Sequence, residues 1–147
     1  MATPTSSLGV IISREDPASP GTFNPIGSVG DVSGPDFGSD TVETTAHDAA
    51  ARRRTYIATL GKSTQVGFPV FLDSADAQHG ANATSGLVGD GIAGSLRNFR
   101  ITYPDNGAMK IGFSAIVNQA EVAAPVEGAM MMNVALQVSG AFTFDGF

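Results

Sequence analysis

The chain has 147 residues, a formal net charge of -6, no cysteine and no tryptophan. This length is enough for one domain with a buried core. Without cysteine, disulfide bonds and thiolate-ligated metals are excluded, and the acidic balance disfavours nucleic-acid binding through counterion release. Eighteen glycines and eight prolines are typical of a loop-rich β protein.

Charge is unevenly distributed along the chain. Residues 1–51 hold one basic and seven acidic residues, whereas residues 52–147 hold seven of each. The whole net charge therefore lies in the first third, which includes Asp31, Asp40 and Glu43. An acidic surface of this kind can line a passage for DNA without binding to it.

The first twenty residues are predicted to form an extended arm. They are rich in Ser, Thr and Pro, and the prolines at 17 and 20 disfavour a helix. No signal peptide is expected, because a basic segment followed by an apolar run is missing. The apolar run 8–12 is too short to span a membrane. Such an arm is either disordered in the free subunit or docked through this run.

Two weak strands and a long loop are predicted next. Residues 23–32 and 41–45 have the composition of strands, the second because it is rich in β-branched residues. Residues 45–63 lack a sustained strand pattern and lie between strand-like segments. We therefore expect a long loop here, and loops of this length inside a compact domain are usually functional or disordered.

The most concentrated charge of the chain lies in this loop. Arg52, Arg53 and Arg54 are consecutive, and Tyr56 follows them. Three interpretations remain open: a solvated loop, a contact with the acidic first third of a neighbouring copy, or a nucleic-acid contact. The overall acidity and the lack of aromatic residues beyond Tyr56 disfavour the last interpretation.

An edge strand and a short helix are predicted in the middle of the chain. Residues 65–72 alternate in polarity, and Pro69 favours a sheet edge because it has no backbone donor. Residues 86–96 approximate helical spacing, although four glycines weaken it. The pattern G-x-G-x-x-G at 89–94 indicates dinucleotide binding only after a buried strand in a βαβ unit. That context is absent from this sequence.

Residues 98–144 form the most regular part of the chain and are predicted to be three consecutive strands. A turn at 104–107 separates the first two, and a phase change near Asn118-Gln119 indicates a β-bulge. The last strand alternates over thirteen residues, against a usual length of about five to six. A strand this long suggests a sheet that continues beyond one subunit. Its second face is small and polar, as the wall of a water-filled lumen would be: Ala135, Gln137, Ser139, Ala141 and Thr143.

No motif calls for catalysis or a cofactor. His47 and His79 have no cysteine nearby, so loop positions explain them better than a metal site. Asn82 fits the glycosylation pattern, which a chain without a secretory signal matches by chance. Nothing selects a catalytic pair among the fourteen acidic residues. We expect no enzyme activity, no metal and no cofactor.

The order of these segments resembles the major tail (tail tube) protein of long-tailed, non-contractile bacteriophages of the lambda-like kind. The resemblance covers roughly residues 21–144, although 77–94 is longer and looser than in such proteins. It rests on a strand ending at 29–35, a Val/Thr-rich acidic strand at 40–45 entering the arginine loop, and a strand pair ending at 138–140. The most recognisable stretch is Leu96-Arg97-Asn98-Phe99-Arg100-Ile101-Thr102-Tyr103-Pro104-Asp105-Asn106-Gly107.

The resemblance implies a mainly β fold in a single domain over residues 1–147. The expected architecture is a two-sheet β-sandwich or barrel-like tail tube fold with one short flanking helix, a long loop and an extended N-terminal arm. It further implies that six copies form a ring, that their inner sheets join into a continuous β-barrel, and that stacked rings conduct DNA.

The resemblance also implies which residues lie between copies. The loop 45–63 and the arm 1–20 are the expected bridges between rings, with candidate contacts at Arg52, Arg53, Arg54 and Tyr56. The implied lumen is acidic, with Asp31, Asp40 and Glu43 as candidates.

The implied partners are further copies of the chain together with the tape measure, tail tip and tail terminator proteins. DNA would pass without specific binding, and no membrane is involved. The implied location is the virion tail, assembled in the host cytoplasm.

Two other classes compete with this interpretation. A β-sandwich binding or adhesion module that recognises carbohydrate or a cell surface is the alternative. Such modules expose aromatic side chains over a binding face, whereas aromatic residues make up only 7% of this chain. A hydrolase is the least supported class.

Overall fold

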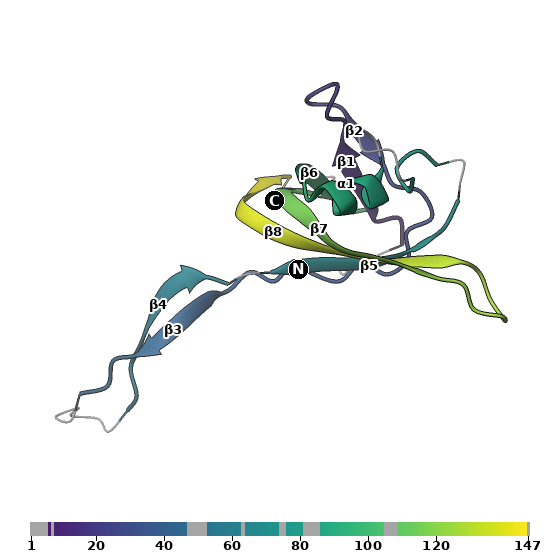
Figure 1. Ribbon diagram of the computed structural model, residues 1–147. Coiled ribbons are helices and arrows are strands. Elements are labelled where there is room, and N and C mark those ends of the chain that lie inside the picture. Colours follow the sequence, from purple (N-terminus) through teal and green to yellow (C-terminus); the bar gives the residue numbers. More distant parts are fainter. Residues whose placement is uncertain are drawn as a thin grey trace.

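The computed structural model describes residues 6, 8–46, 53–62, 64–73, 76–80, 86–104 and 109–146. Within these ranges the chain forms eight strands and one helix (Figure 1). They are β1 (Ile11–Glu15), β2 (Phe23–Pro25), β3 (Ser39–Glu43), β4 (Tyr56–Gly61), β5 (Gln65–Phe71), α1 (Leu87–Ala93), β6 (Leu96–Thr102), β7 (Lys110–Ala123) and β8 (Met131–Asp145).

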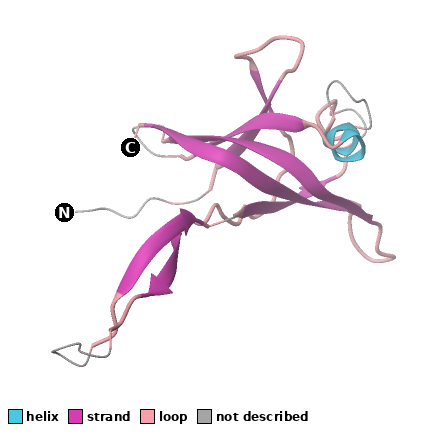
Figure 2. Cartoon of the chain, turned by 60° about the vertical axis from the view of Figure 1, so that its left-hand side comes forward, coloured by secondary structure: helices cyan, strands magenta, loops and turns pink. Residues whose placement is uncertain are grey.

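Six strands form one antiparallel sheet, and the other two form a separate hairpin. The order in the large sheet is β2-β1-β6-β7-β8-β5, and β3 pairs with β4. Figure 2 shows the hairpin extending away from the rest of the described chain, with α1 on the opposite side. The predicted mainly β fold, with two sheets and a single short helix, is confirmed.

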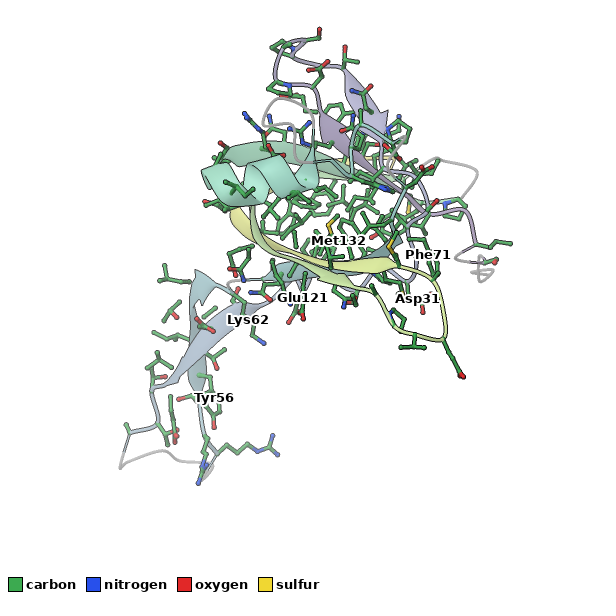
Figure 3. All side chains as sticks on the ribbon, turned by 45° about the vertical axis from the view of Figure 1, so that its right-hand side comes forward. Asp31, Tyr56, Lys62, Phe71, Glu121 and Met132 are labelled. Atoms are coloured by element: carbon green, nitrogen blue, oxygen red, sulfur yellow. The ribbon has the colours of Figure 1, made fainter. Side chains whose placement is uncertain are left out.

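A single apolar core lies against one face of the large sheet. The alternation predicted for the long strands places Phe113 of β7 and Val134 of β8 in this core, and Phe99 of β6 stacks on Phe113 with 6.1 Å between ring centroids. Figure 3 shows side chains filling the space between the β1 part and the β5 part of the sheet. The large sheet therefore bends around its own core, and the second sheet is the projecting hairpin. The buried apolar residues are Ile12, Ile26, Val66, Phe68, Val70, Leu87, Phe99, Ile101, Ile111, Phe113, Ala115, Val117, Met132, Val134 and Leu136.

Two irregularities interrupt the pairing of β7 with β8. The register shifts between Val117 and Gln119, which confirms the predicted bulge. It shifts again where Gly112 pairs with Thr143 and Ser114 pairs with Ser139, so β8 has extra residues there. Bulges bend a strand and increase its twist, so both shifts favour the bending of the sheet.

The prediction of an extended arm over residues 1–20 is wrong for part of its length. Residues Ile11–Glu15 form β1, which lies inside the sheet between β2 and β6. Ile12, Ser13 and Arg14 are buried. A strand this short has little periodicity of its own, and pairing on both sides supplies the backbone hydrogen bonds that stabilise it. The strand predicted at 23–32 is also shorter and consists of β2 alone, with isolated bridges at Val29 and Ser33.

The prediction of a long loop over residues 45–63 is wrong at its second end. Residues Tyr56–Gly61 form β4, which pairs with β3 at positions such as Val42 with Ile57 and Glu43 with Tyr56. Every residue of both strands is exposed. Neither face packs on the core, so the hydrophobic alternation that marks a half-buried strand is not required here.

The edge position predicted for residues 65–72 is confirmed by β5, the last strand of the large sheet. Residues 28–33 cover its outer edge. The amide of Gly30 donates to the carbonyl of Pro69 at 2.8 Å, and Ser33 and Gly67 exchange two backbone hydrogen bonds of 2.8 and 2.9 Å. The backbone hydrogen-bonding groups at this edge of the sheet therefore find partners within the same chain.

Helix α1 lies within the residues 86–96 predicted to be helical. It ends at Gly94, which adopts a left-handed conformation with φ of 65° and donates to the carbonyl of Asp90. The turn predicted at 104–107 falls largely on residues outside those described. Among the described residues, α1 is too short and too polar to be a transmembrane helix.

Candidate assembly surfaces

The hairpin of β3 and β4 presents apolar side chains on both faces. Val42 and Ile57 lie opposite each other on one face, and the register shift before Gly61 places Leu60 on that face too, while Tyr56 lies on the other. All four are more than half exposed, and Leu60 is 75% exposed. An isolated two-stranded hairpin is at best marginally stable in water, and clustered exposed apolar residues mark interaction sites. The hairpin thus has the properties of a surface that a partner covers.

The predicted contact residues lie at the far end of this hairpin. Arg53 and Arg54 lie just before β4, separated from its first residue Tyr56 by Thr55, while Arg52 lies outside the described residues. The Arg54 Nε lies 3.9 Å from Oε1 of Glu43. Because both side chains are solvent-exposed, this ion pair contributes little to stability. The described arginines are therefore available to a partner.

The three acidic residues predicted for the lumen do not form one surface. Asp40 and Glu43 lie on β3 of the hairpin, whereas Asp31 lies in the segment that covers the edge of β5. All three are exposed. Figure 3 shows Asp31 well apart from the hairpin residue Tyr56. Their lumen position stays a prediction.

The outer face of the large sheet carries many polar residues, as the sequence pattern predicted for the last strand, and it also exposes the apolar side chains of Leu96, Ile116 and Phe71. Hydrogen bonds cross its strands: Asn98 of β6 donates to Glu15 of β1 at 3.0 Å, and Ser114 of β7 donates to Asn98 at 2.6 Å. Gln65 of β5 donates to Gln137 of β8 at 3.0 Å. The small polar face predicted for the last strand is thus part of a wider polar surface. Register also places on it Gly67, Pro69, Gly112, Gln119, Glu121, Asn133, Ala135, Ser139 and Thr143.

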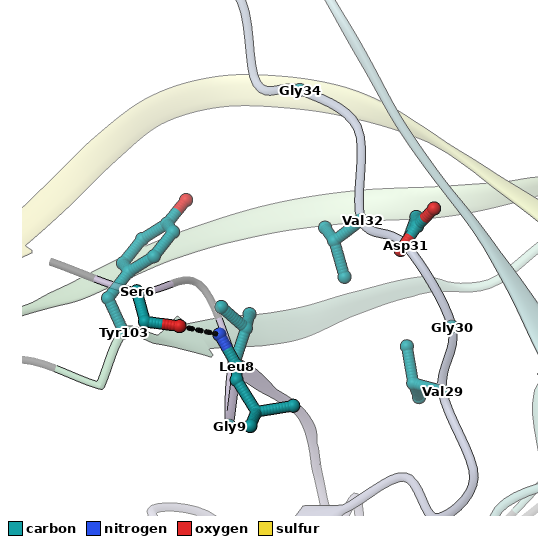
Figure 4. Close-up of a pocket in the computed structure, with 10 residues that line it drawn as sticks. Ser6, Leu8, Gly9, Val29, Gly30, Asp31, Val32, Gly34 and Tyr103 are labelled. Atoms are coloured by element: carbon teal, nitrogen blue, oxygen red, sulfur yellow. Dashed lines mark hydrogen bonds between the residues drawn. The ribbon is translucent and has the colours of Figure 1, made fainter.

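A shallow groove of about 620 Å³ lies between residues 6–10 and residues 29–34 (Figure 4). Val29 and Val32 form one wall and Leu8 the other, and Tyr103 lies beside them. The amide of Leu8 donates to Oγ of Ser6 at 3.2 Å. Burial raises the pKa of the Tyr103 hydroxyl above its ordinary value.

A buried ion cluster that sequence reasoning missed connects α1 to the sheet. Arg14 of β1 donates to both carboxylate oxygens of Asp90, with Nε to Oδ2 at 2.5 Å and Nη2 to Oδ1 at 2.9 Å. Arg97 of β6 donates to Oδ1 at 3.1 Å. Arg14 and Asp90 are completely buried. The residues of the G-x-G-x-x-G pattern thus serve packing: Asp90 forms the ion cluster, Gly94 ends the helix, and a Cβ at Gly91 would lie 3.4 Å from Val117.

The one described histidine, His79, is held by contacts with the backbone of two segments. His79 is buried, its Nδ1 accepts a hydrogen bond from the amide of Asp73 at 3.1 Å, and its Nε2 lies 2.8 Å from the carbonyl of Gly27. Asp76 accepts from the amide of Gly27 at 3.0 Å. These contacts fix the segment before α1 against the segment after β2. Within the described ranges no group of three or more potential metal ligands is present.

Comparisons with known proteins find similarity in three-dimensional structure but not in sequence. The chain matches no protein-family profile, and no curated protein matches it in sequence. Solved structures match at low sequence identity. A chain from the tail of an empty gene transfer agent particle, with C6 symmetry, has a TM-score of 0.77 at 18% identity and covers 96% of this chain and 98% of its own.

Two further matches come from other tube assemblies. The SPP1 tail tube structure has a TM-score of 0.68 at 18% identity, covering 98% of this chain and 80% of that chain. A chain of the sheath–tube complex of PVC, an extracellular contractile injection system, has a TM-score of 0.67 at 13% identity, with 97% and 91% covered. The chain therefore has the fold found in tail and tube assemblies, over almost its whole length.

Proposed function

We propose that this protein is a structural subunit of a tail tube, which assembles with further copies of itself and performs no catalysis. The observation that carries this proposal is the β3–β4 hairpin, whose residues are all exposed although both faces are partly apolar. A monomer leaves that surface in water at a free-energy cost, whereas a second copy would cover it. The fold similarity to tail and tube assemblies supports the same role.

Two strand segments are suited to close a ring. Pairs between β6 and β7 end at Leu96 and Ile116, so β7 residues 117–123 pair only with β8. Pairs between β5 and β8 end at Gln65 and Gln137, and the amide of Val138 still donates to the carbonyl of Thr64 at 3.1 Å, so β5 and β8 are not paired beyond Val138 in the described chain. The two segments, residues 117–123 of β7 and 139–145 of β8, have similar lengths and open toward opposite sides of the sheet. Rotation about a ring axis would bring them together as an antiparallel pair, with the stagger that barrel closure requires.

In such a ring the polar outer face of the sheet would line the lumen. Glu121 of β7 lies on this face opposite Asn133 of β8, and it is exposed. We infer that Glu121 contributes an acidic side chain to this lumen wall, whereas the predicted Asp31, Asp40 and Glu43 lie outside this sheet face. A polar, acidic wall suits DNA passage without specific binding, because the phosphates are repelled and not held.

The finer features of the proposal follow from the resemblance to lambda-like tail tube proteins. They are six copies per ring, stacking through the hairpin, contacts with tape measure, tail tip and tail terminator proteins, and delivery of DNA through a virion tail assembled in the host cytoplasm. The C6 symmetry named for the gene transfer agent tail supports sixfold rings.

The direct test is negative-stain electron microscopy of the purified chain over a range of concentrations, with light scattering beside it. Rings or hollow tubes are expected. A variant with residues 39–61 replaced by a Gly-Ser linker should keep a cooperative thermal unfolding transition, because the hairpin lies outside the core, yet form no tubes. A wild-type chain that stays monomeric at every concentration and binds glycans would contradict the proposal and favour the binding module.

A further inference from the structure

An aromatic cluster with an open side lies at the root of the hairpin. The Phe37 ring centroid lies 4.8 Å from that of Phe142 and 5.5 Å from that of Phe144. Phe142 in turn lies 6.0 Å from the core residue Phe113. Phe37 is nevertheless 53% exposed. The cluster thus continues from the core to the surface, where the Phe37 ring is left exposed to solvent.

A cavity of about 600 Å³ opens beside this cluster. Phe37 and Phe142 supply its apolar wall, Ser39 lies where the hairpin begins, and Asp36 and Lys62 supply charge. Lys62 forms no ion pair with any residue that the structure describes. The site therefore combines two aromatic side chains with a lysine that forms no ion pair with a described residue, although Asp36 lines the same cavity.

The turn between β7 and β8, residues 124–130, carries an exposed apolar side chain and an acidic side chain, which complement the aromatic wall and the lysine of the cavity. Val126 is fully exposed at 103%, and Val122 and Met130 beside it are more than half exposed. Glu127 follows Val126 directly and has no ion-pair partner among the described residues. An apolar side chain with an adjacent acid thus projects from the end of the longest strand pair.

These two features lie at opposite ends of the same strand. β8 starts at Met131 beside the turn and ends at Asp145 near Phe37, and its fifteen residues span at most about 46 Å, because the bulge shortens the strand. Figure 1 shows the turn on the far side of the molecule from the hairpin. The turn cannot reach the cavity within one copy. Copies stacked head to tail along β8, in contrast, would bring each turn to the cavity of the next copy, which is a heterologous, repeating contact.

We propose that Val126 of one copy inserts beside Phe37 and Phe142 of the next copy along the tube, and that Glu127 pairs there with Lys62. This contact rests on the proposed self-assembly and differs from a contact through the exposed faces of the hairpin, because Val126 and Glu127 lie in the turn between β7 and β8 and the cavity reaches only the end residues Ser39 and Gly61 of the hairpin. Burial of a Val side chain and of the open aromatic surface supplies the attraction, and the ion pair fixes the orientation.

The first experiment uses the absence of native cysteine. In the Ser39→Cys/Val126→Cys double variant, mild oxidation of assembled protein should give a ladder of covalent dimers, trimers and longer chains. Each single variant should give no species beyond a dimer. The matched control is Ser19→Cys/Val126→Cys, because Ser19 is also exposed but lies in the turn between β1 and β2. It should form longer chains at least tenfold more slowly.

The second experiment is a charge exchange. Lys62→Glu and Glu127→Lys should each reduce the yield of tubes at least fivefold at low ionic strength, and the double exchange should restore most of it. Circular dichroism of each variant excludes loss of the fold. If the wild type forms no tubes, both the proposed function and this contact fail. If it forms tubes but the cysteine pair reacts no faster than its control, only this contact is overturned.

Discussion

Arg14 and Asp90, which are 76 positions apart, form a bidentate ion pair that is completely buried between β1 and α1. Arg97 adds a third charged group to the same carboxylate. The cluster attaches the only described helix to the strand that precedes every other strand in the chain. It therefore places α1 on the core side of the sheet and leaves the polar outer face uncovered.

Asp90→Asn should lower the free energy of unfolding by about 3–5 kcal/mol, because it leaves the Arg14 guanidinium buried without a counter-charge. Arg97→Gln is the control and should cost less, because the Arg97 side chain is partly exposed. Urea denaturation followed by circular dichroism measures both. A loss below about 1 kcal/mol for Asp90→Asn would mean that the ion cluster is not needed for stability.

Gly34→Ala should destabilise the protein by about 1–3 kcal/mol. Gly34 has φ of 88°, and an added Cβ would lie 2.5 Å from the carbonyl oxygen of Gln65, so the segment covering the edge of β5 would have to move. Gly61→Ala is the matched control, since nothing lies within 4 Å of its added Cβ. Thermal unfolding of the two variants gives the comparison. Equal melting temperatures would contradict the close approach at Gly34.

Replacement of Arg52, Arg53 and Arg54 by Glu should leave a folded subunit that cannot form tubes. The two described arginines lie at the exposed far end of the hairpin, so the fold does not depend on them. The variant Ala18→Glu/Ser19→Glu adds acidic residues at another exposed turn and should assemble normally. Sedimentation and electron microscopy report assembly. Normal tubes from the triple variant would exclude these arginines from the contact between rings.

Glu121→Cys should become inaccessible to large reagents on assembly if the polar sheet face lines the lumen. A small maleimide should label it in monomers and tubes, whereas a maleimide carrying a long polyethylene glycol chain should label it only in monomers. Ile92→Cys on α1 is the control, because Ile92 is 80% exposed and α1 packs on the opposite face of the sheet. Full labelling of Glu121→Cys in tubes by the large reagent would place this face outside the lumen.

Local sequence patterns were sufficient to predict the strands that pack on the core. The strands β7 and β8 are long and bury one face, so the alternation of their side chains predicted both strands and the bulge near Asn118-Gln119. Pro69 marked the edge position of β5 for an equally local reason, its missing donor. The small and polar residues on one side of β8 likewise predicted a sheet face exposed to solvent.

Only the tertiary structure decided the features that depend on distant pairing. β1 lies inside the sheet because β2 and β6 supply its hydrogen bonds, and β4 exists because β3 pairs with it, so neither required a periodic sequence of its own. The Arg14–Asp90 pair joins residues 76 positions apart, and no spacing in the sequence indicates it. The sequence by itself thus determined which strands bury a face, whereas long-range pairing decided where the sheet ends, where the hairpin projects and which surfaces remain for another copy.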